Sequence, residues 1–300
     1  MTDMYYEITE ESNERLDLFL VQQMPDFSRA HIQKLISSGA VQVNQKEKKA
    51  NYKLRAGDQV EITLPEPQVT EIKAEKIPLD VLYEDEHIIV INKARGMVVH
   101  PASGVYTGTL VNALLYHWGR NAVESVKDGS PSEILAARRP GIVHRLDKDT
   151  SGVIITAKNR DAEEWLQNQF KSRHLRKEYI AIVHGRPPAS AGDIRTQILR
   201  DPKNRKRFKA VTGTTEGKFA RTLYHCICCY GNYSLIRVRL KTGRTHQIRV
   251  HMKYIGCPIL GDPIYAKPDA LFPDATLMLH AREMMIRLPG NRKLTIFKAA

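Results

Sequence analysis

The stretch His144-Arg145-Leu146-Asp147-Lys148-Asp149-Thr150-Ser151-Gly152 places two acids, three bases and two hydroxyls within nine residues. A carboxylate among fixed cations stays ionised at neutral pH and can act as a nucleophile or a base. The flanking runs 141–143 and 152–155 are apolar and typical of buried strands, which favours a functional turn over a merely solvated one. Charge alone does not distinguish Asp147 from Asp149.

The same segment carries a family resemblance. Arg139-Pro140-Gly141-Ile142-Val143-His144-Arg145-Leu146-Asp147, followed by Thr150-Ser151-Gly152, resembles the signature of the RluA/RluD-type RNA pseudouridine synthases. The resemblance implies that Asp147 is the catalytic residue. It also makes Arg145 and His144 candidates for RNA contact, with Arg145 filling the space that a flipped base leaves.

Composition indicates a polyanionic partner. Lysine and arginine number 46 against 33 acidic residues, a formal charge of +13 over 300 residues, which favours nucleic acid over a membrane surface. We find no apolar run of the roughly 20 residues that a membrane span needs, and no signal-peptide pattern at the N-terminus. We therefore expect a cytoplasmic protein, with a monomer as the default.

The cysteines do not show the spacing of a metal site. Cys226, Cys228 and Cys229 crowd one strand-like run and Cys257 stands apart, whereas zinc sites combine spaced pairs. We predict reduced thiols, most of them packed as small hydrophobic groups, and neither a metal site nor a cofactor.

Residues 1–75 are predicted to form a small α/β module and a linker. Two short helical patterns, the second capped by Ser28, precede alternating strands, and 66–78 have the composition of a linker. The module resembles the RNA-binding domain named after ribosomal small-subunit protein S four, through four short motifs. RNA-binding candidates here are Arg15, Ser28, Arg29 and Lys34.

Residues 76–300 mix strands and helices without a regular βαβ repeat, which predicts an α+β domain. The resemblance implies a mixed, largely antiparallel central sheet with flanking helices and a catalytic cleft. We interpret 119–133 as a surface loop and expect Thr245 to cap a helix that follows the turn at Gly243.

Two further motifs match the family. Read alone, Tyr179 in Lys177-Glu178-Tyr179 is an ordinary strand tyrosine, but the family pattern implies that its ring lies against the target base. The run Gly243-Arg244-Thr245-His246-Gln247-Ile248-Arg249 also matches, and implies that Arg249 pairs with Asp147 and keeps it ionised. Arg244 is a candidate for phosphate contact.

Residues 200–209 carry six cations in ten positions. A solvated loop is the ordinary interpretation of such a run, but beside the other motifs it favours phosphate contact, with Arg205 and Lys206 as candidates.

Taken together, these features predict a cofactor-free isomerase that converts uridine to pseudouridine in large-subunit ribosomal RNA. Two alternatives remain open from the sequence. The enzyme could act on transfer RNA, or the chain could be a non-catalytic RNA-binding assembly factor. A kinase is disfavoured because the motif register differs and no glycine-rich nucleotide loop precedes it.

Overall fold

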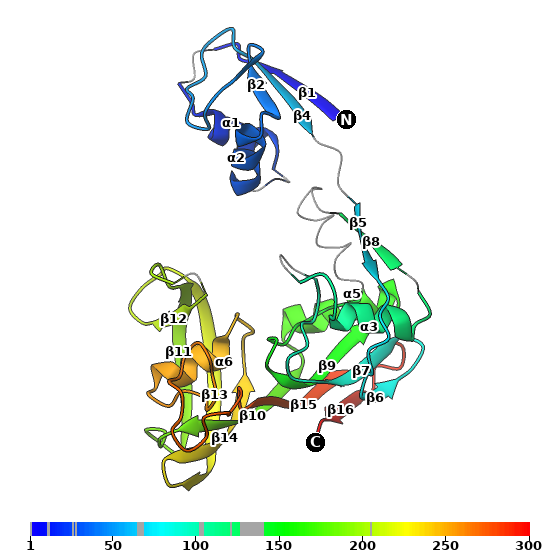
Figure 1. Cartoon of the computed structure of the whole chain (residues 1–300), viewed down its shortest axis with the longest axis vertical. Helices are drawn as coiled ribbons and strands as arrows, with labels where there is room; N and C mark the ends of the chain where they lie inside the picture. Colours follow the sequence, from blue (N-terminus) through cyan, green and yellow to red (C-terminus); the bar gives the residue numbers. More distant parts are fainter. Residues whose placement is uncertain are drawn as a thin grey trace. The chain divides into compact units, whose positions relative to one another are not determined.

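The computed structural model describes residues 2–10, 13–25, 27, 29–64, 69–101, 105–120, 122–126, 141–204 and 206–300. The chain divides into two units (Figure 1). The first comprises Met1–Ala74 and Gly119–Arg139, and the second comprises Glu75–Trp118 and Pro140–Ala300. Each unit is described by itself.

The first unit contains a four-stranded antiparallel sheet in the order β1-β4-β2-β3, with two helices. Its elements are β1 Thr2–Glu7, α1 Leu16–Gln23, α2 Arg29–Ser37, β2 Val41–Val43, β3 Lys46–Glu47 and β4 Gln59–Leu64. The two predicted helices and the strands around Val41 and Val60 are confirmed. The sequence analysis missed β1, an edge strand that is recognised by its pairing with β4.

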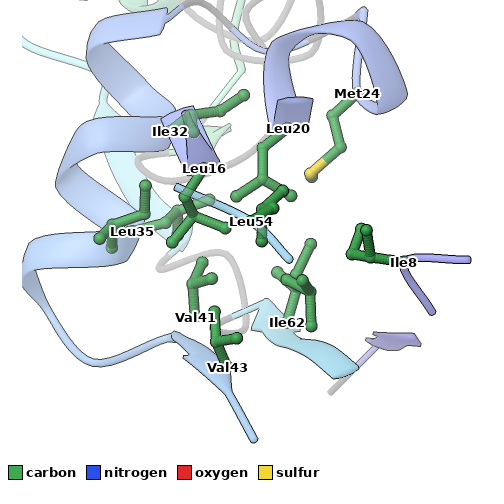
Figure 2. Close-up of a cluster of buried hydrophobic side chains, with 12 residues drawn as sticks. Ile8, Leu16, Leu20, Met24, Ile32, Leu35, Val41, Val43, Leu54 and Ile62 are labelled. Carbon is green, nitrogen blue, oxygen red and sulfur yellow. The ribbon is translucent and has the colours of Figure 1, made fainter. Parts of the chain in front are cut away.

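Figure 2 shows how the helices close over this sheet. Leu16 and Leu20 of α1 and Ile32 of α2 point toward the same apolar cluster as Val43 and Ile62 of the strands. All five side chains are buried. Burying a side chain of this size contributes about 1.5–3 kcal/mol, so this small core stabilises the unit.

The predicted linker and surface loop are partly wrong. Val69–Lys73, inside the supposed linker, form β5, and Ala122–Val126, inside the supposed loop, form β8. The two strands pair antiparallel from Val69 opposite Val126 to Lys73 opposite Ala122. Sequence reasoning missed this ladder because each strand is short and half polar, and each is recognised only by its partner.

The second unit is built on one large sheet in the order β12-β11-β13-β14-β10-β15-β9-β7-β6, with β16 paired to β15. Among the strands that the structure describes, the β9–β15 pair is the one parallel pair in this sheet. The prediction of an α+β fold with a mixed, largely antiparallel sheet is confirmed. The strands are β6 Val81–Glu84, β7 Ile88–Lys93, β9 Ser151–Ala157, β10 Arg176–His184, β11 Ala191–Arg200, β12 Phe208–Val211, β13 Lys218–Tyr230, β14 Tyr233–Leu240, β15 Leu279–Arg287 and β16 Leu294–Lys298.

Three described helices accompany this sheet: α3 Leu110–His117, α5 Arg160–Ser172 and α6 Gln247–Tyr254. Helix α5 packs on β9, where Ala162 and Leu166 join the core with Val153 and Ile155. Helix α6 packs on the other part of the sheet, against β11, β12 and β13 (Figure 1). The segment around Asp147 therefore leads into a strand that one helix covers, and Arg249 lies on another helix.

Glycines of the signature serve close packing. Gly152 has φ +109°, and a Cβ there would lie 2.2 Å from the carbonyl oxygen of Ala281 on β15. Gly141 has φ +70°, and its Cβ would lie 2.0 Å from the carbonyl oxygen of Ala157. Any larger residue at either position would collide with backbone. The expected strand at 141–143 is wrong: Ile142 makes one isolated bridge to Thr156, because the turn at Gly141 ends the pairing.

Two smaller expectations are also corrected. Helix α6 is preceded by His246 in the left-handed conformation, with no side-chain cap, so Thr245 does not cap it. All four cysteines are free thiols, but Cys228 and Cys229 are exposed, and of the four only Cys257 is fully buried. The strand alternation fails here because a bulge lies between Cys226 and Cys228. Within the described part of the chain, no helix has the length and apolarity to cross a membrane.

Candidate active site

Asp147 lies in the turn before β9 and keeps 22% of its side chain exposed. Its Oδ2 accepts a hydrogen bond from Nη1 of Arg249 at 3.2 Å, and Nε2 of His246 lies 3.9 Å from the same oxygen. Among the described residues, Oδ1 has no hydrogen-bond partner. One oxygen is thus held by the protein, and the other is available to a ligand.

Arg249 is buried and joins two carboxylates. Its Nε and Nη2 donate to Oδ2 and Oδ1 of Asp262 at 2.7 and 2.8 Å, while Nη1 reaches Asp147. Burial acts to lower the pKa of the guanidinium, but the hydrogen bonds and charge of Asp262, with the charge of Asp147, outweigh it and raise that pKa. Arg249 is therefore a fixed cation beside the catalytic candidate.

Sequence reasoning missed Asp262. Its carboxylate is fully buried and also accepts from the backbone N–H groups of Ile264 and Tyr265, at 2.9 and 3.0 Å from Oδ1. These two bonds hold the carboxylate in a tight turn, where it also accepts from Arg249. No local signal distinguishes this aspartate, because its importance comes from a partner 13 residues away on α6.

Tyr265 contacts Arg249, and His246 contacts Tyr265. The guanidinium carbon of Arg249 lies 5.2 Å from the centre of the Tyr265 ring, a cation–π contact. The Tyr265 hydroxyl lies 2.9 Å from Nδ1 of His246 and accepts from the backbone N–H of Phe208 at 3.0 Å. Burial lowers the pKa of His246, and the nearby charge of Asp147 opposes that effect.

Tyr179 lies on β10 and is 7% exposed. Burial, aided by the charge of Asp147, raises the pKa of its hydroxyl, so the side chain is protonated at neutral pH. The hydroxyl has no hydrogen-bond partner among the described residues. Asp147 thus lies close enough to Tyr179 and Arg249 for its charge to affect the pKa of both, although the three residues come from separate segments of the chain.

A buried lysine supports the turn that contains Asp147. Nζ of Lys93, at the end of β7, donates to the carbonyl oxygens of Ala94, Met97 and Lys148 at 2.7, 2.9 and 3.1 Å. Burial lowers the pKa of this ammonium to about 8, against the charges of Asp149 and Asp147. Lys93 therefore ties the residue next to Asp147 to the neighbouring loop. No local pattern in the sequence distinguishes this lysine, so its role is visible only in the structure.

His144 and Arg145 have different environments. The His144 ring stacks on Phe170 with 4.6 Å between centroids, and its Nε2 accepts from the backbone N–H of Ile155 at 3.1 Å. Burial, together with the charge of Lys177, lowers the pKa of His144 to about 3. The ring is half-buried and its Nε2 is already bonded to the protein, so less of His144 than of Arg145 is available for RNA contact. Arg145 is exposed, as RNA contact requires.

The basic run at 200–209 lies near this site. Phe208 packs edge-on against His246, with 5.6 Å between ring centroids, and Lys206 precedes it in an exposed turn between β11 and β12. Arg205 lies outside the described residues. Arg244 is partly buried and donates from Nε to the carbonyl of Phe219 at 3.0 Å. Lys206 and Arg244 thus remain RNA-binding candidates on two loops next to α6.

In the first unit, Arg15 and Arg29 are joined by Asp17. The carboxylate of Asp17 is fully buried and lies 2.9 Å from Nε of Arg15 and 2.9 Å from Nη2 of Arg29. Each arginine side chain remains about half exposed, and Lys34 is exposed on α2. Asp17 therefore orients two of the predicted RNA-binding residues. Ser28 lies outside the described residues.

Two known families match the sequence of this chain. The family described as RNA pseudouridylate synthase matches residues 87–254, which include Asp147, Tyr179 and Arg249. The S4 domain matches residues 14–60, which cover both helices of the first unit.

Several curated proteins are similar over most of the chain. The uncharacterized RNA pseudouridine synthase YlyB of Bacillus subtilis is 46% identical over 85% of this chain and 80% of its own length. Proteins named ribosomal large subunit pseudouridine synthase D are 42% identical in Zymomonas mobilis, over 84% of this chain and 77% of that protein, and 40% identical in Borreliella burgdorferi, over 92% and 83%.

Two solved human structures share the fold. Human RNA pseudouridylate synthase domain containing 4 is 26% identical, with a TM-score of 0.55 over 74% of this chain and 88% of that chain. Human RNA pseudouridylate synthase domain containing 1 is 23% identical, with a TM-score of 0.57 over 76% and 85%. The family match and the curated relatives lead to one conclusion: the chain belongs to the RluA/RluD family of RNA pseudouridine synthases and is an isomerase.

Proposed function

We propose that this protein converts specific uridines to pseudouridine in large-subunit ribosomal RNA, with Asp147 as the catalytic residue. The observation that carries the proposal is the asymmetric carboxylate of Asp147, held through Oδ2 by Arg249 while Oδ1 is free to meet a substrate. Two relatives named for the ribosomal large subunit, 42% and 40% identical, support this choice of RNA.

The reaction breaks the C1′–N1 bond of uridine, turns the uracil, and joins C1′ to C5. Glycosidic cleavage is assisted by a carboxylate near the anomeric carbon. Oδ1 of Asp147 either attacks C1′ or removes a ribose proton, and both routes need the ionised form. Arg249 favours that form, because an opposite charge within hydrogen-bond distance stabilises a carboxylate. Uracil leaves as an anion and bonds to C1′ through C5. This step breaks the C1′–Oδ1 bond of the first route, or is accompanied by return of the ribose proton in the second, and the C5 proton is then lost.

No cofactor is required by this chemistry. Substrate and product are isomers, so the rearrangement involves neither net oxidation nor a transferred group. The proton lost from C5 is balanced by the proton that N1 of the turned base acquires. A held carboxylate and a base pocket are sufficient for these steps.

The target uridine has to leave the RNA stack to reach Asp147, at a cost of about a few kcal/mol. We propose that Arg145, exposed two residues before Asp147, fills the vacated space. Tyr179 would hold the extruded base against its ring, because flat aromatic faces stack on nucleobases. Its protonated hydroxyl is free to donate a hydrogen bond to the base or ribose.

We further propose that residues 1–75 bind RNA and that residues 76–300 carry catalysis. The S4 match over residues 14–60 supports the first assignment, and the synthase match over 87–254 supports the second. In the first unit Arg15, Arg29 and Lys34 would contact phosphates. We place the reaction in the cytoplasm, where the ribosomal RNA of bacteria is made, and take the acting species to be a monomer.

The test is release of tritium from C5-labelled uridine in an unmodified transcript of bacterial large-subunit ribosomal RNA. Wild type should release tritium, and Asp147→Asn should release none while still binding the RNA. Asp149→Asn is the matched control, because it removes the same charge two residues away and should retain most of the activity. Release only from transfer RNA would overturn the choice of substrate. No release from either RNA would favour a non-catalytic assembly factor.

A further inference from the structure

The second unit has a strongly basic cavity that the proposed catalytic steps do not use. Its volume is about 360 Å³. It is lined by five arginines and one lysine with a few apolar and hydroxyl groups, namely Arg173, Leu175, Arg176, Arg195, Phe219, Arg221, Arg239, Leu240, Lys241 and Thr242. No carboxylate is part of this lining.

The strand register separates this cavity from the catalytic residues. Tyr179 pairs with Val238 across β10 and β14, and the next pair is Glu178 with Arg239. Successive side chains of a strand point to opposite faces of the sheet, so Arg239 points away from the face that carries Tyr179. Arg176, two residues before Glu178, shares the face of Arg239. The cavity lining does not include Asp147, Tyr179 or Arg249.

Three carboxylates around the cavity partly neutralise its cations. Asp193 lies 2.6 Å from Nη2 of Arg195 and 3.0 Å from Nη2 of Arg221. Glu178 lies 3.8 Å from Nη2 of Arg239, and Glu283 is paired with Arg176. The six lining cations outnumber these three acids, and two of the acids are also shared with Arg237 and Lys298. Like charges held together this way repel unless an anion joins them.

Two of the cations have no acidic partner. Within the described part of the chain, neither Arg173 nor Lys241 makes an ion pair. The paired arginines also have N–H donors left for a ligand. Arg195 and Arg221 each donate to Asp193 from Nε and Nη2, and Nη1 of each makes no hydrogen bond among the described residues. Planar arginine groups that present N–H donors in a fixed orientation match the geometry of phosphate oxygens.

The cavity is also joined to the active site through the loop from β14 to α6. Thr242, at the cavity wall, donates from Oγ1 to Oε1 of Gln247 at 2.7 Å, and Gln247 begins the helix that carries Arg249. On the same loop, Arg244 donates to the carbonyl of Phe219, another lining residue. The loop therefore connects the cavity wall to the helix that carries Arg249, the partner of Asp147.

We propose that this cavity binds a phosphodiester group of the substrate RNA, outside the nucleotide that is modified. The proposal rests on the proposed function, since it takes the bound polyanion to be the RNA substrate. It implies that the RNA contacts both faces of the sheet, around the end of β14. The contact positions the RNA and takes no part in bond breaking.

The test removes two cavity cations without leaving an acid unpaired. In the double variant Arg195→Gln, Lys241→Gln, Asp193 keeps Arg221 as its partner. The matched control is Arg160→Gln, Lys293→Gln, which removes the same charge from exposed positions elsewhere in the second unit. RNA affinity is measured across a salt titration with the unmodified large-subunit transcript. Tritium release at saturating RNA is measured in parallel.

The cavity variant should bind RNA at least about fivefold more weakly than the control, and the slope of log affinity against log salt should fall by about 1, as for one lost phosphate contact. Its tritium release at saturating RNA should match wild type. Equal affinity and slope in variant and control would overturn the cavity proposal. Binding loss without any tritium release by wild type would instead overturn the proposed function and leave the cavity as an RNA site.

A small anion is the remaining occupant to test. Uridine 5′-monophosphate and inorganic phosphate are titrated into wild type and the cavity variant by calorimetry. Tight binding of either probe that the variant loses, with RNA affinity unchanged, would assign the cavity to a small phosphate compound and reject the RNA proposal. Weak binding of both probes agrees with a site that needs the rest of the RNA.

Discussion

Nη1 of Arg249 lies 3.2 Å from Oδ2 of Asp147, although the two residues are 102 positions apart in the chain. The other two nitrogens of this guanidinium are held by the buried carboxylate of Asp262. Arg249 thus cannot leave Asp147 without breaking a second, better-shielded pair. Asp147 is therefore oriented by Arg249, and Arg249 is itself held in place by Asp262.

Replacing Asp262 should therefore damage both stability and chemistry. Asp262→Asn leaves the buried guanidinium without its neutralising charge, and breaking a buried pair costs about 3–5 kcal/mol. Thermal unfolding should show this loss. The rate of uridine isomerisation at saturating RNA should fall much more than RNA affinity, because the change acts on the position of Asp147. Asp193→Asn is the control, since its partners are partly exposed and its loss should cost about 1 kcal/mol or less. Equal destabilisation by the two variants would contradict the role of Asp262 in holding Arg249.

Changes at Tyr179 should separate the ring from the hydroxyl. Tyr179→Phe keeps the ring, and the hydroxyl has no partner among the described residues, so the free energy of unfolding should change by less than about 1 kcal/mol. RNA affinity should also persist. Tyr179→Leu removes the stacking face, which contributes about 1–3 kcal/mol per base, and should weaken binding about 5- to 150-fold. Equilibrium binding with the unmodified transcript measures this. Equal affinity of the Phe and Leu variants would show that the ring does not stack on the base.

The first unit should lose stability in acid through Asp17. Burial alone would raise the pKa of this carboxyl, but hydrogen bonds from Arg15, Gln33 and Arg29 lower it from 3.8 to about 2. Because the folded pKa lies below the unfolded one, the stabilisation is complete above about pH 4 and is lost as the pH falls toward 2. Hydrogen exchange of α1 and α2 in the full chain should accelerate over that range. Asp17→Asn should show weak protection already at pH 7, and unchanged protection in this variant would refute the role of the carboxylate.

The thiols should differ in reactivity according to their exposure. Cys228 and Cys229 are exposed, whereas Cys257 is buried. Hydrogen bonds from Ser234 and Cys226 lower the pKa of Cys229, which favours the reactive thiolate. A short pulse of iodoacetamide, followed by peptide mass mapping, should label Cys229 first and Cys257 only after unfolding. Ser234→Ala should slow the labelling of Cys229. Early labelling of Cys257 would show that this part of the sheet opens readily.

Much of the architecture follows from local sequence. Helix α5 was predictable because Ala162, Trp165, Leu166 and Phe170 repeat at helical spacing. The buried strand β7 was predictable from its continuous apolar run. Strands β1, β5 and β8 were missed because they are short and partly polar, and only a partner strand defines them.

The candidate site divides in the same way. The sequence by itself determined the family motifs, and so Asp147, Tyr179 and Arg249, because these residues lie in continuous runs that can be recognised without a fold. Only the tertiary structure decided that Asp262 holds Arg249, that the His144 ring stacks on Phe170, and that six cations line one cavity. The physical reason is that these relations depend on strand register and side-chain direction between segments far apart in the chain, which no local pattern encodes.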